Sequence, residues 1–322
     1  MGSVAFVFPG QGSQSVGMGE SLVTAYPSAA ATFAAADAAL SEPIARLAFA
    51  GPADELDRTE NAQPALLATS IAYLRSLEDA LASIGRPPLE PAFIAGHSMG
   101  QYSAMVAAGV VAFDDGIRLV RERGRLMQAS GRDGAMAAII GLDDARLPEL
   151  VAVGQAQGVF GVANRNSPGQ VVVSGERAAV EAAAEAAKGM GAKRAIVLPV
   201  SVAAHSPLMA EAADGMRRVL ATVAFSDPAI PLLANADAHR LTTGDACRAE
   251  LVEHLTTGVD WIAAVQAMAA AGVTAFIEVG PGRVLTGLIK RIVPELDAIA
   301  LDDPTAPGRL AIPDLDAVAA SA

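Results

Sequence analysis

Apolar residues along this chain form short continuous runs, separated by longer segments in which they recur at helical spacing. The runs 4–8, 93–95 and 276–279 are typical of buried strands, because a parallel strand is covered on both faces. The segments 27–40 and 61–84 have the pattern of helices, and a proline stands in the first turn of the second one. Strands that alternate with helices predict a parallel sheet covered by helices, which is the α/β class.

The segment 134–199 follows a different order and predicts a unit of its own. Its expected elements are a strand over 135–141, a helix over 143–155, strands over 159–163 and 170–174, a helix over 177–190 and a strand over 194–199. Between the two central strands lies a polar turn, 164–169. This βαββαβ order is the ferredoxin-like arrangement. We therefore predict a small subdomain over 133–199, inserted into a large catalytic subdomain formed by 1–132 and 200–322.

Composition and charge narrow the function classes. The 322 residues are 52% hydrophobic and 18% charged, which fits a well-cored protein, and the net charge of −12 argues against nucleic acid as a partner. A single cysteine, Cys247, excludes an internal disulfide framework and a thiolate metal cluster, and we expect it to be a small buried hydrophobe. No secretion signal and no apolar run of roughly 18 residues is visible, so we expect a cytoplasmic protein with no membrane partner. The sequence carries no usable oligomer signal, and a monomer is the expectation.

The apolar run 93–95 ends in Gly96-His97-Ser98-Met99-Gly100, and a helix-compatible run follows at once. A strand, a sharp turn that carries a serine and a helix are the order of a nucleophile elbow. Side chains two residues either side of the serine would collide in so tight a turn, which explains both glycines. The alternative is an ordinary strand-to-helix turn with an incidental serine. The flanking strand and helix favour Ser98 as the nucleophile.

A serine hydroxyl needs a nearby base to remove its proton. The side chain of His97 diverges from Ser98, His239 lies in a polar turn, and His254 lies on a helix where a solvated position is the commoner outcome. His205 follows an apolar strand at the point where the insert returns to the main body. It is the candidate base, with a buried structural histidine as the alternative. No acidic residue between Ser98 and His205 stands out as the third member of a hydrolase triad.

Two further segments leave their roles open from the residues alone. The glycine-rich loop 9–14 follows the first strand but lacks the ending of a phosphate loop and the spacing of a dinucleotide site. It is either part of a ligand site or an ordinary strand-exit turn. One later helix carries four arginines that cannot all share a face, so at most one or two point at the elbow; they are Arg118, Arg121, Arg123 and Arg125.

Taken together, Ser98, His205 and the loop 9–14 make the chain resemble the malonyl-CoA:acyl-carrier-protein transacylases and the acyltransferase components of polyketide synthases. The resemblance runs in the same order along nearly the whole chain, through the motifs at 6–14, 63–67, 96–102, 123–124, 166–170, 199–205 and 278–282. It implies an α/β-hydrolase-like core with a parallel sheet and an inserted ferredoxin-like subdomain. It also implies malonyl-CoA as substrate, an acyl carrier protein as partner, and no bound cofactor or metal.

The resemblance assigns roles to matching residues. Ser98 would be acylated, His205 would be its general base, and Arg123 would grip the free carboxylate of malonyl through two parallel hydrogen bonds. In this family a backbone carbonyl, here that of Thr257, takes the place of the triad acid. The remaining assignments are an oxyanion hole from Gln11 and the Met99 N–H, support of the site by Gln63, and carrier or CoA contacts from Lys193, Arg194, Lys290 and Arg291. For these four basic residues, ordinary solvated surface is the alternative.

Some departures from the family pattern bear on specificity. The family often has glutamate where this chain has Gln101, which could alter the charge of the cleft, and asparagine in place of Thr257. Met99 favours unbranched malonyl, whereas the small Ala204 leaves a substituted malonyl open. Two other hypotheses are a serine hydrolase directed at acyl carrier proteins and an inactive carrier-docking module. The sequence does not separate fatty-acid from polyketide biosynthesis.

Overall fold

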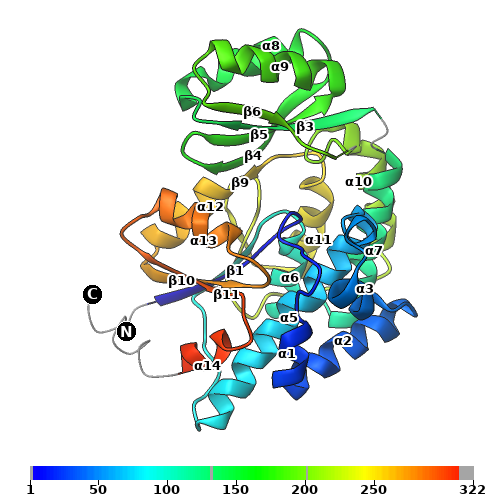
Figure 1. Cartoon of the computed structure of the whole chain (residues 1–322), viewed down its shortest axis with the longest axis vertical. Coiled ribbons are helices and arrows are strands. Elements are labelled where there is room, and N and C mark those ends of the chain that lie inside the picture. The colour runs from blue at the N-terminus through cyan, green and yellow to red at the C-terminus, as the bar shows by residue number, and fades with distance from the viewer. Residues whose placement is uncertain (1–2, 131–132, 201, 312–322) are drawn as a thin grey trace.

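Two β-sheets organise the computed structural model, which describes residues 3–130, 133–200 and 202–311 (Figure 1). The larger sheet has the strand order β11-β10-β1-β2-β7-β8. All neighbouring pairs are parallel except β7 with β8. The strands are β1 (Ser3–Phe8), β2 (Phe93–Gly96), β7 (Leu232–Leu233), β8 (Arg240–Leu241), β10 (Val273–Val279) and β11 (Asp297–Leu301).

Helices cover both faces of this sheet, as the continuous apolar strands predict. Along β1, Phe6 and Phe8 pack into one hydrophobic cluster, whereas the alternate residues Ala5 and Val7 pack into another. The first cluster contains side chains of α5, α6 and α7, and the second those of α12 and α13. The helices outside the insert are α1 (Glu20–Ala25), α2 (Pro27–Leu40), α3 (Ile44–Ala50), α4 (Ala53–Leu56), α5 (Thr59–Ser83), α6 (Gly100–Ala107), α7 (Phe113–Ser130), η2 (Pro207–Met209), α10 (Ala210–Leu220), α11 (Gly244–Glu253), α12 (Trp261–Ala270), α13 (Val284–Ile292) and α14 (Ala306–Ala311).

The smaller sheet has the order β6-β3-β5-β4-β9 and carries α8 and α9 on one face, at the top of Figure 1. Its strands β3, β5, β4 and β6 pair antiparallel, which gives the ferredoxin-like arrangement expected from the sequence. The bounds are β3 (Gly134–Ile140), η1 (Asp144–Arg146), α8 (Leu147–Gln155), β4 (Phe160–Ser167), β5 (Gln170–Glu176), α9 (Arg177–Gly189) and β6 (Arg194–Val197). The predicted fold class is therefore confirmed.

A fifth strand joins this sheet from outside the insert. The short β9 (Val259–Asp260) pairs in parallel with β4, with Val259 opposite Asn164. The smaller sheet therefore includes a strand, β9, that comes after the insert in the sequence. The division into 1–132 with 200–322 and 133–199 stays a prediction, and its parts at 1–2, 131–132, 201 and 312–322 lie outside the described residues.

One local prediction within the insert is wrong. The expected turn over 164–169 is much shorter, because β4 continues to Ser167, which pairs with Gln170 of β5. Two irregularities in the register, at 162–164 and 165–167, let the polar residues enter the strand. Asn164 and Asn166 therefore lie on a strand rather than in a solvated turn. Within the described part of the chain, no helix is both long and apolar enough to cross a lipid bilayer.

Candidate active site

The turn between β2 and α6 has the geometry of an elbow. Ser98 has a φ of 53°, in the left-handed region, and its N–H donates to Asn235 Oδ1 at 2.9 Å. A Cβ on Gly96 would lie 2.1 Å from the backbone carbon of Gly100, and one on Gly100 would lie 2.1 Å from the Phe8 carbonyl oxygen. Both glycines are thus required by close backbone contacts, as expected from the sequence.

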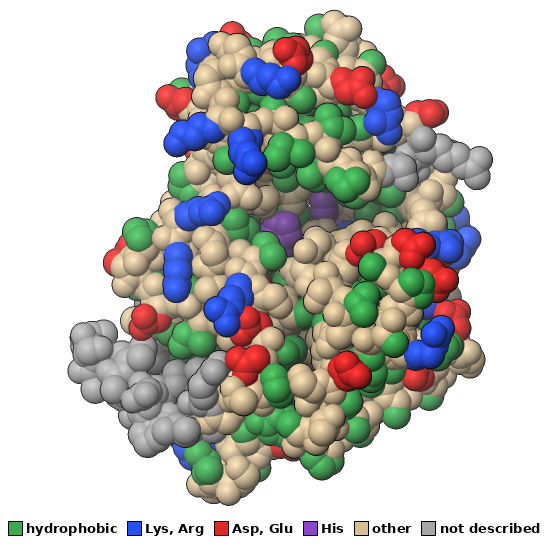
Figure 2. Space-filling model, viewed as in Figure 1, with side chains coloured by type: hydrophobic (Ala, Val, Ile, Leu, Met, Phe, Trp, Pro, Cys, Tyr) green, Lys and Arg blue, Asp and Glu red, His purple; other side chains and the backbone are tan. Residues whose placement is uncertain are grey.

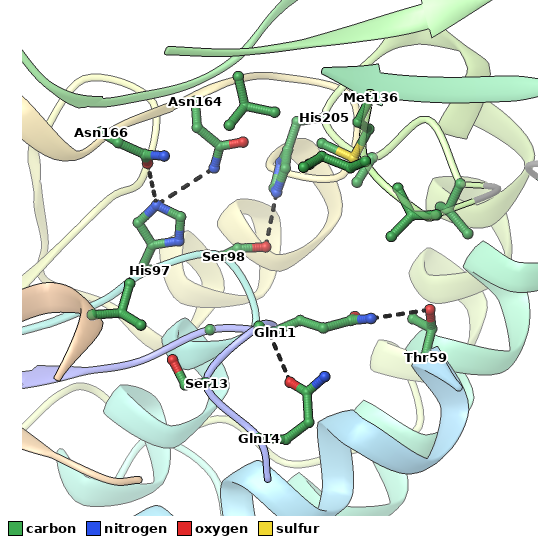
Figure 3. A pocket seen from close by; sticks show the side chains of 18 of the residues that line it. Gln11, Ser13, Gln14, Thr59, His97, Ser98, Met136, Asn164, Asn166 and His205 are labelled. Atoms are coloured by element: carbon green, nitrogen blue, oxygen red, sulfur yellow. Dashed lines mark hydrogen bonds between the residues drawn. The ribbon is translucent and has the colours of Figure 1, made fainter. Parts of the chain in front are cut away.

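Ser98 and His205 are brought together across the site (Figure 3). Ser98 Oγ lies 2.8 Å from His205 Nε2, and His205 is only 5% exposed. On the far side of the ring, Nδ1 lies 2.6 Å from the His254 carbonyl and 3.1 Å from the Thr257 carbonyl. Because carbonyls only accept, Nδ1 carries the proton and Nε2 is free to accept from Ser98. The resemblance named only the Thr257 carbonyl; that of His254 is closer.

The electrostatic surroundings keep this imidazole neutral. Burial and the nearby Arg123 charge lower the pKa of His205 to about 3. Burial likewise lowers the pKa of His254 and of His97. A neutral histidine with its Nε2 lone pair on a serine hydroxyl can remove the hydroxyl proton.

Arg123 on α7 is 2% exposed and points at the serine. Its Nη2 lies 3.4 Å from Ser98 Oγ and 3.2 Å from His254 Nε2, and its guanidinium lies over the ring of Tyr102. In the described part of the chain no acidic side chain pairs with it. The other three arginines of α7 pair with acidic groups away from the elbow, in the pairs Arg118–Asp115, Arg121–Glu42 and Arg125–Glu122.

The placement of His254 corrects the sequence prediction. We expected a solvated side chain, but His254 is fully buried next to Arg123 and His205. It directly follows α11, which packs against α6, so its exposure depends on a distant part of the chain. Helical position alone carries no signal of this burial.

A cavity of about 470 Å³ lies in front of these residues, between the smaller sheet and the loops that follow β1 and β2 of the larger sheet. The insert contributes Met136, Asn164 and Asn166, and α13 contributes Leu288. In Figure 2 the cavity opens as a hollow between the part that carries α8 and α9 and the rest of the chain, with histidine side chains visible inside.

The insert reaches the elbow through His97. Its ring diverges from Ser98, as expected, and Nε2 lies 2.9 Å from Asn166 Oδ1 and 3.5 Å from Asn164 Nδ2 (Figure 3). The ring also packs edge-on against Trp261. Sequence patterns missed both asparagines, because they were assigned to a turn.

The remaining polar residues of the site differ in how they are placed. Gln11 lines the cavity, but its side chain is exposed and donates to Thr59 Oγ1 at 3.3 Å. The Met99 side chain is buried, and among the described residues no group accepts from its N–H. Gln63 is buried on α5, where Nε2 contacts Met127 Sδ at 3.7 Å. Met127 itself lines the cavity.

Gln101 does not affect the charge of the cleft, contrary to expectation. It is fully buried and turned away from the cavity, where Oε1 accepts from the Gly96 N–H and Nε2 donates to the Leu233 carbonyl. Its amide joins the end of β2 to the end of β7. Ala204, in contrast, does line the cavity.

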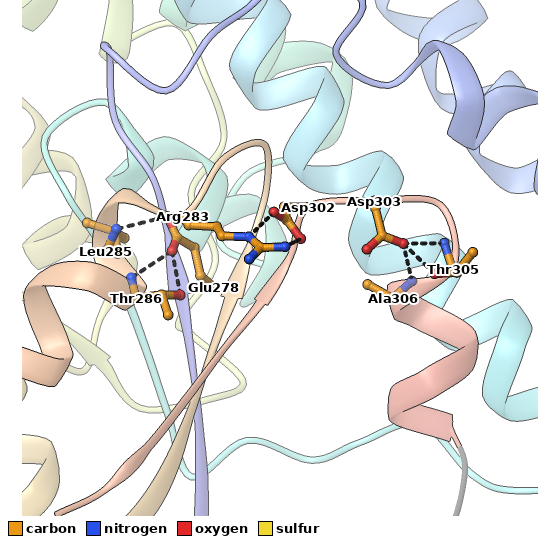
Figure 4. Close-up of polar contacts among 8 residues, drawn as sticks. All are labelled: Glu278, Arg283, Leu285, Thr286, Asp302, Asp303, Thr305 and Ala306. Carbon is orange, nitrogen blue, oxygen red and sulfur yellow. Dashed lines mark hydrogen bonds and ion pairs between the residues drawn. The ribbon is translucent and has the colours of Figure 1, made fainter. Parts of the chain in front are cut away.

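The wall formed by α13 is fixed by one buried carboxylate (Figure 4). Glu278 accepts from the Leu285 and Thr286 N–H groups and from Thr286 Oγ1, at 2.7–3.0 Å. A carboxylate at a helix N-terminus satisfies free amides and the helix dipole. Burial raises the pKa of Glu278, and Arg283 next to it pairs with Asp302.

The four basic residues assigned to the carrier or CoA, which we call the basic margin, come from the last turn of α13 and from the start of β6. Arg291 donates to Gln170 Oε1 at 2.6 Å, and Gln170 lines the cavity. Lys193 packs at Gly141, whose N–H donates to the Gly169 carbonyl beside Gln170. Lys290 and Arg194 are exposed neighbours of these two residues. Across residues 3–130, 133–200 and 202–311, no group of three or more His, Cys, Asp or Glu side chains is placed to share a metal ion.

The chain is similar to known acyltransferases over most of its length. The family described as "Acyl transferase domain" matches residues 5–305. The malonyl CoA-acyl carrier protein transacylase of Escherichia coli (strain K12) is 48% identical over 308 residues, which cover 95% of this chain and 98% of that relative. An acyl carrier protein S-malonyltransferase structure from Vibrio cholerae matches with a TM-score of 0.89 at 43% identity and covers 98% of this chain and 99% of that one. A malonyl-transacylase in complex with its type II PKS acyl-carrier protein matches with a TM-score of 0.90 at 44% identity, with 97% and 99% covered.

Proposed function

The chain belongs to the acyl transferase domain family, and from this premise we propose that it moves a malonyl group from malonyl-CoA to the phosphopantetheine thiol of an acyl carrier protein. The family expected from the sequence motifs is confirmed. The names of the relatives support malonyl-CoA and the carrier as the two substrates. Within this chain, one observation carries the proposal: a buried guanidinium, that of Arg123, lies beside the Ser98 hydroxyl with no described acidic partner.

The first half-reaction acylates Ser98. His205 Nε2 takes the hydroxyl proton as Ser98 Oγ forms a bond to the thioester carbon, which gives a tetrahedral oxyanion. When the oxyanion collapses, the C–S bond breaks and the CoA sulfur receives the proton from His205. The product is a malonyl ester on Ser98 and free CoA.

The second half-reaction returns the enzyme to its starting state. The carrier thiol gives its proton to His205 Nε2 and its sulfur attacks the ester carbon. The C–O bond to Ser98 breaks, and Ser98 Oγ takes the proton back from His205. The carbonyls of His254 and Thr257 hold the Nδ1 proton throughout, so that only Nε2 exchanges protons, which is the orienting role of the acid in other serine triads.

Two backbone features support oxyanion stabilisation at the elbow. The Met99 N–H, which no described group accepts, stands at the N-terminus of α6, where the helix dipole favours negative charge. The loop that carries Gln11 follows β1 directly beside the elbow, where Gly10 packs against the His97 carbonyl, so the second donor in our proposal is Gln11. Gln63 supports this arrangement indirectly, through its contact with Met127.

Arg123 is proposed to bind the free carboxylate of the malonyl group. A planar guanidinium offers two parallel N–H groups to a carboxylate, and burial strengthens the pair. The desolvated cation without an acidic partner is costly in the free protein and is compensated when a carboxylate arrives. We call this use of Arg123 the carboxylate clamp. It favours acyl transfer over the alternative of a carrier-directed hydrolase, which would not need a clamp. A substituted malonyl remains a second candidate, because Ala204 leaves space in the cavity.

The basic margin is proposed to meet the carrier or the CoA phosphates. In Figure 2, Lys and Arg side chains gather on the left of the hollow, and Asp and Glu side chains on the right. Such a local patch can attract an anionic partner although the chain as a whole has a net charge of −12. Action as a cytoplasmic monomer is part of the same proposal and rests on the sequence alone.

Intact-protein mass spectrometry after incubation with malonyl-CoA tests the proposal. We expect a malonyl adduct on the wild-type chain, none on Ser98→Ala, and loss of the adduct when a carrier protein is added and gains the same mass. Release of free malonate without a gain on the carrier would support the hydrolase instead. No adduct at all would overturn both enzymatic functions.

A further inference from the structure

His254 has a side chain that neither motif nor resemblance assigned to the reaction. We propose that the His254 side chain is a positioning residue, which holds Arg123 ready for a substrate carboxylate and thereby raises the preference for carboxylated acyl groups. This inference rests on the proposed function. It concerns the imidazole alone, because the carbonyl of His254 that holds His205 belongs to the backbone.

The hydrogen bonds of the ring fix its tautomer. His254 Nδ1 lies 2.9 Å from the Glu250 carbonyl, one helical turn earlier. A carbonyl oxygen can only accept, so Nδ1 carries the hydrogen. His254 Nε2 therefore has a free lone pair, and it faces Arg123 Nη2 at 3.2 Å. The ring thus accepts a hydrogen bond from the guanidinium.

The neutral state of this acceptor matters for the clamp. Burial and the Arg123 charge hold the pKa of His254 well below its usual range, so the ring stays uncharged. A carboxylate in the same place would form an ion pair with Arg123 and cancel the charge that the substrate needs. An uncharged imidazole orients the guanidinium and leaves its charge available.

Other neighbours of Arg123 do not replace this contact. The Tyr102 ring lies 5.8 Å away and favours the cation without fixing its direction, and Ser98 Oγ, at 3.4 Å, is needed for the reaction itself. The buried carboxylate of Glu250 on α11 accepts from the Asn235 N–H at 2.7 Å, and among the described ion pairs none joins it to Arg123. The His254 ring is therefore the described acceptor that can direct Nη2 without taking part in acyl transfer.

The position of His254 also fixes the distance between the base, His205, and the guanidinium of Arg123. Its carbonyl lies 2.6 Å from His205 Nδ1 while its ring meets Arg123, so one residue contacts both the base and the clamp. The distance from the serine to the carboxylate of the bound acyl group is then set by a single rigid unit at the end of α11. An acyl group without a carboxylate gains nothing from this arrangement.

Two substitutions separate the acceptor from the ring volume. His254→Gln keeps an acceptor oxygen at a similar reach, and His254→Phe keeps a ring without any acceptor. We expect His254→Phe to lower the ratio of kcat/KM for malonyl-CoA to that for acetyl-CoA by about tenfold or more, mainly through a higher KM for malonyl-CoA. His254→Gln is expected to keep that ratio within about threefold of the wild type. If His254→Phe does not fold, His254→Leu takes its place.

Cys247→Ala is the matched control, because Cys247 is buried on α11, the helix that His254 directly follows, and contacts no catalytic group in the hydrogen bonds described. It is expected to lower the melting temperature and to leave the substrate ratio unchanged. Equal losses for both substrates in His254→Phe, or a collapsed ratio in His254→Gln, would overturn this inference while wild-type acylation stands. A wild-type chain without a malonyl adduct would instead overturn the proposed function.

Discussion

Ser98 and His205 meet at 2.8 Å, and both have a backbone in the left-handed region, with φ of 53° and 60°. Residues with a Cβ rarely adopt this conformation, and each such residue costs roughly 1–2 kcal/mol. The strain is maintained by surrounding contacts, including the bond from the Ser98 N–H to Asn235 and that from the His205 N–H to the Leu255 carbonyl. The left-handed backbone at Ser98 and at His205 thus directs both side chains into the same cavity.

This strain predicts an unusual effect of glycine at the elbow. Ser98→Gly and Ser98→Ala both remove the nucleophile, so neither should form a malonyl adduct. Because glycine adopts positive φ freely, Ser98→Gly should exceed Ser98→Ala in free energy of unfolding by about 1 kcal/mol. Urea denaturation measures the difference. At Ser76, in the interior of α5, the order of the two variants should reverse because alanine favours a helix over glycine, and the same order at both sites would show that strain is not the cause.

Removal of the guanidinium should change substrate choice. Arg123→Ala is expected to lower kcat/KM for malonyl-CoA by about a hundredfold, since two charge-assisted hydrogen bonds are lost, and to affect acetyl-CoA much less. Arg125 lies on the same helix but pairs with Glu122 at the surface, so Arg125→Ala is the control and should keep the malonyl preference. Steady-state kinetics with both thioesters decide. Full malonyl preference in Arg123→Ala would disprove the clamp.

The pKa of His205 predicts how activity responds to acid. A general base works in its unprotonated form, and a pKa lowered from 6.5 to about 3 keeps that form present far below neutral pH. The acid limb of the rate profile should therefore lie well below pH 6.5. The groups that face His205 are the Arg123 cation, the His97 and His254 rings and the Ser98 hydroxyl.

The same cause predicts a shift in a variant. Because the Arg123 charge is one reason for the low pKa, Arg123→Ala should move the acid limb to higher pH. The profile is best measured with acetyl-CoA, which does not depend on the clamp, and Arg125→Ala again serves as the control. An acid limb that stays in place in Arg123→Ala would mean that burial alone sets the pKa.

Charge reversal on the basic margin should weaken the encounter with the carrier. Lys290→Glu and Arg291→Glu are expected to raise KM for the carrier protein about tenfold together, with little change in kcat, because exposed charges steer association. Arg217→Glu on α10 is the control, since Arg217 is an exposed residue paired with Asp214. Transfer kinetics at low and high salt test this. An unchanged carrier KM would leave these residues as ordinary surface.

Elements that depend on local sequence spacing were predicted correctly, and side-chain positions that depend on long-range packing were not. The helix 27–40 and the βαββαβ insert follow from local spacing and are confirmed as α2 and the smaller sheet. Local pattern predicts a solvated His254 because a helical histidine has no local sign of burial, whereas the packing of α11 against α6 buries it. The polar Asn164 predicts a turn, whereas the register irregularities of β4 keep it in a strand at the cavity.

Gln101 gives a final prediction that links this packing to the elbow. Its amide uses both of its ends, since Oε1 accepts from Gly96 N–H at 3.2 Å and Nε2 donates to the Leu233 carbonyl at 2.8 Å. An ionised carboxylate cannot donate, so Gln101→Glu should lower the free energy of unfolding at pH 7 by about 2 kcal/mol or more.

Burial would raise the pKa of the new carboxyl above that in the unfolded chain, so the folded state would bind the extra proton. Relative to the wild type, the variant should therefore regain stability as the pH falls through this raised pKa, because a protonated carboxyl can donate to Leu233. Urea denaturation at pH 7 and at about pH 5 measures both effects, with the exposed Gln157→Glu as a control expected to change stability by less than about 0.5 kcal/mol. A loss that does not shrink at the lower pH would show that the two hydrogen bonds of Gln101 do not hold the strand ends at the elbow.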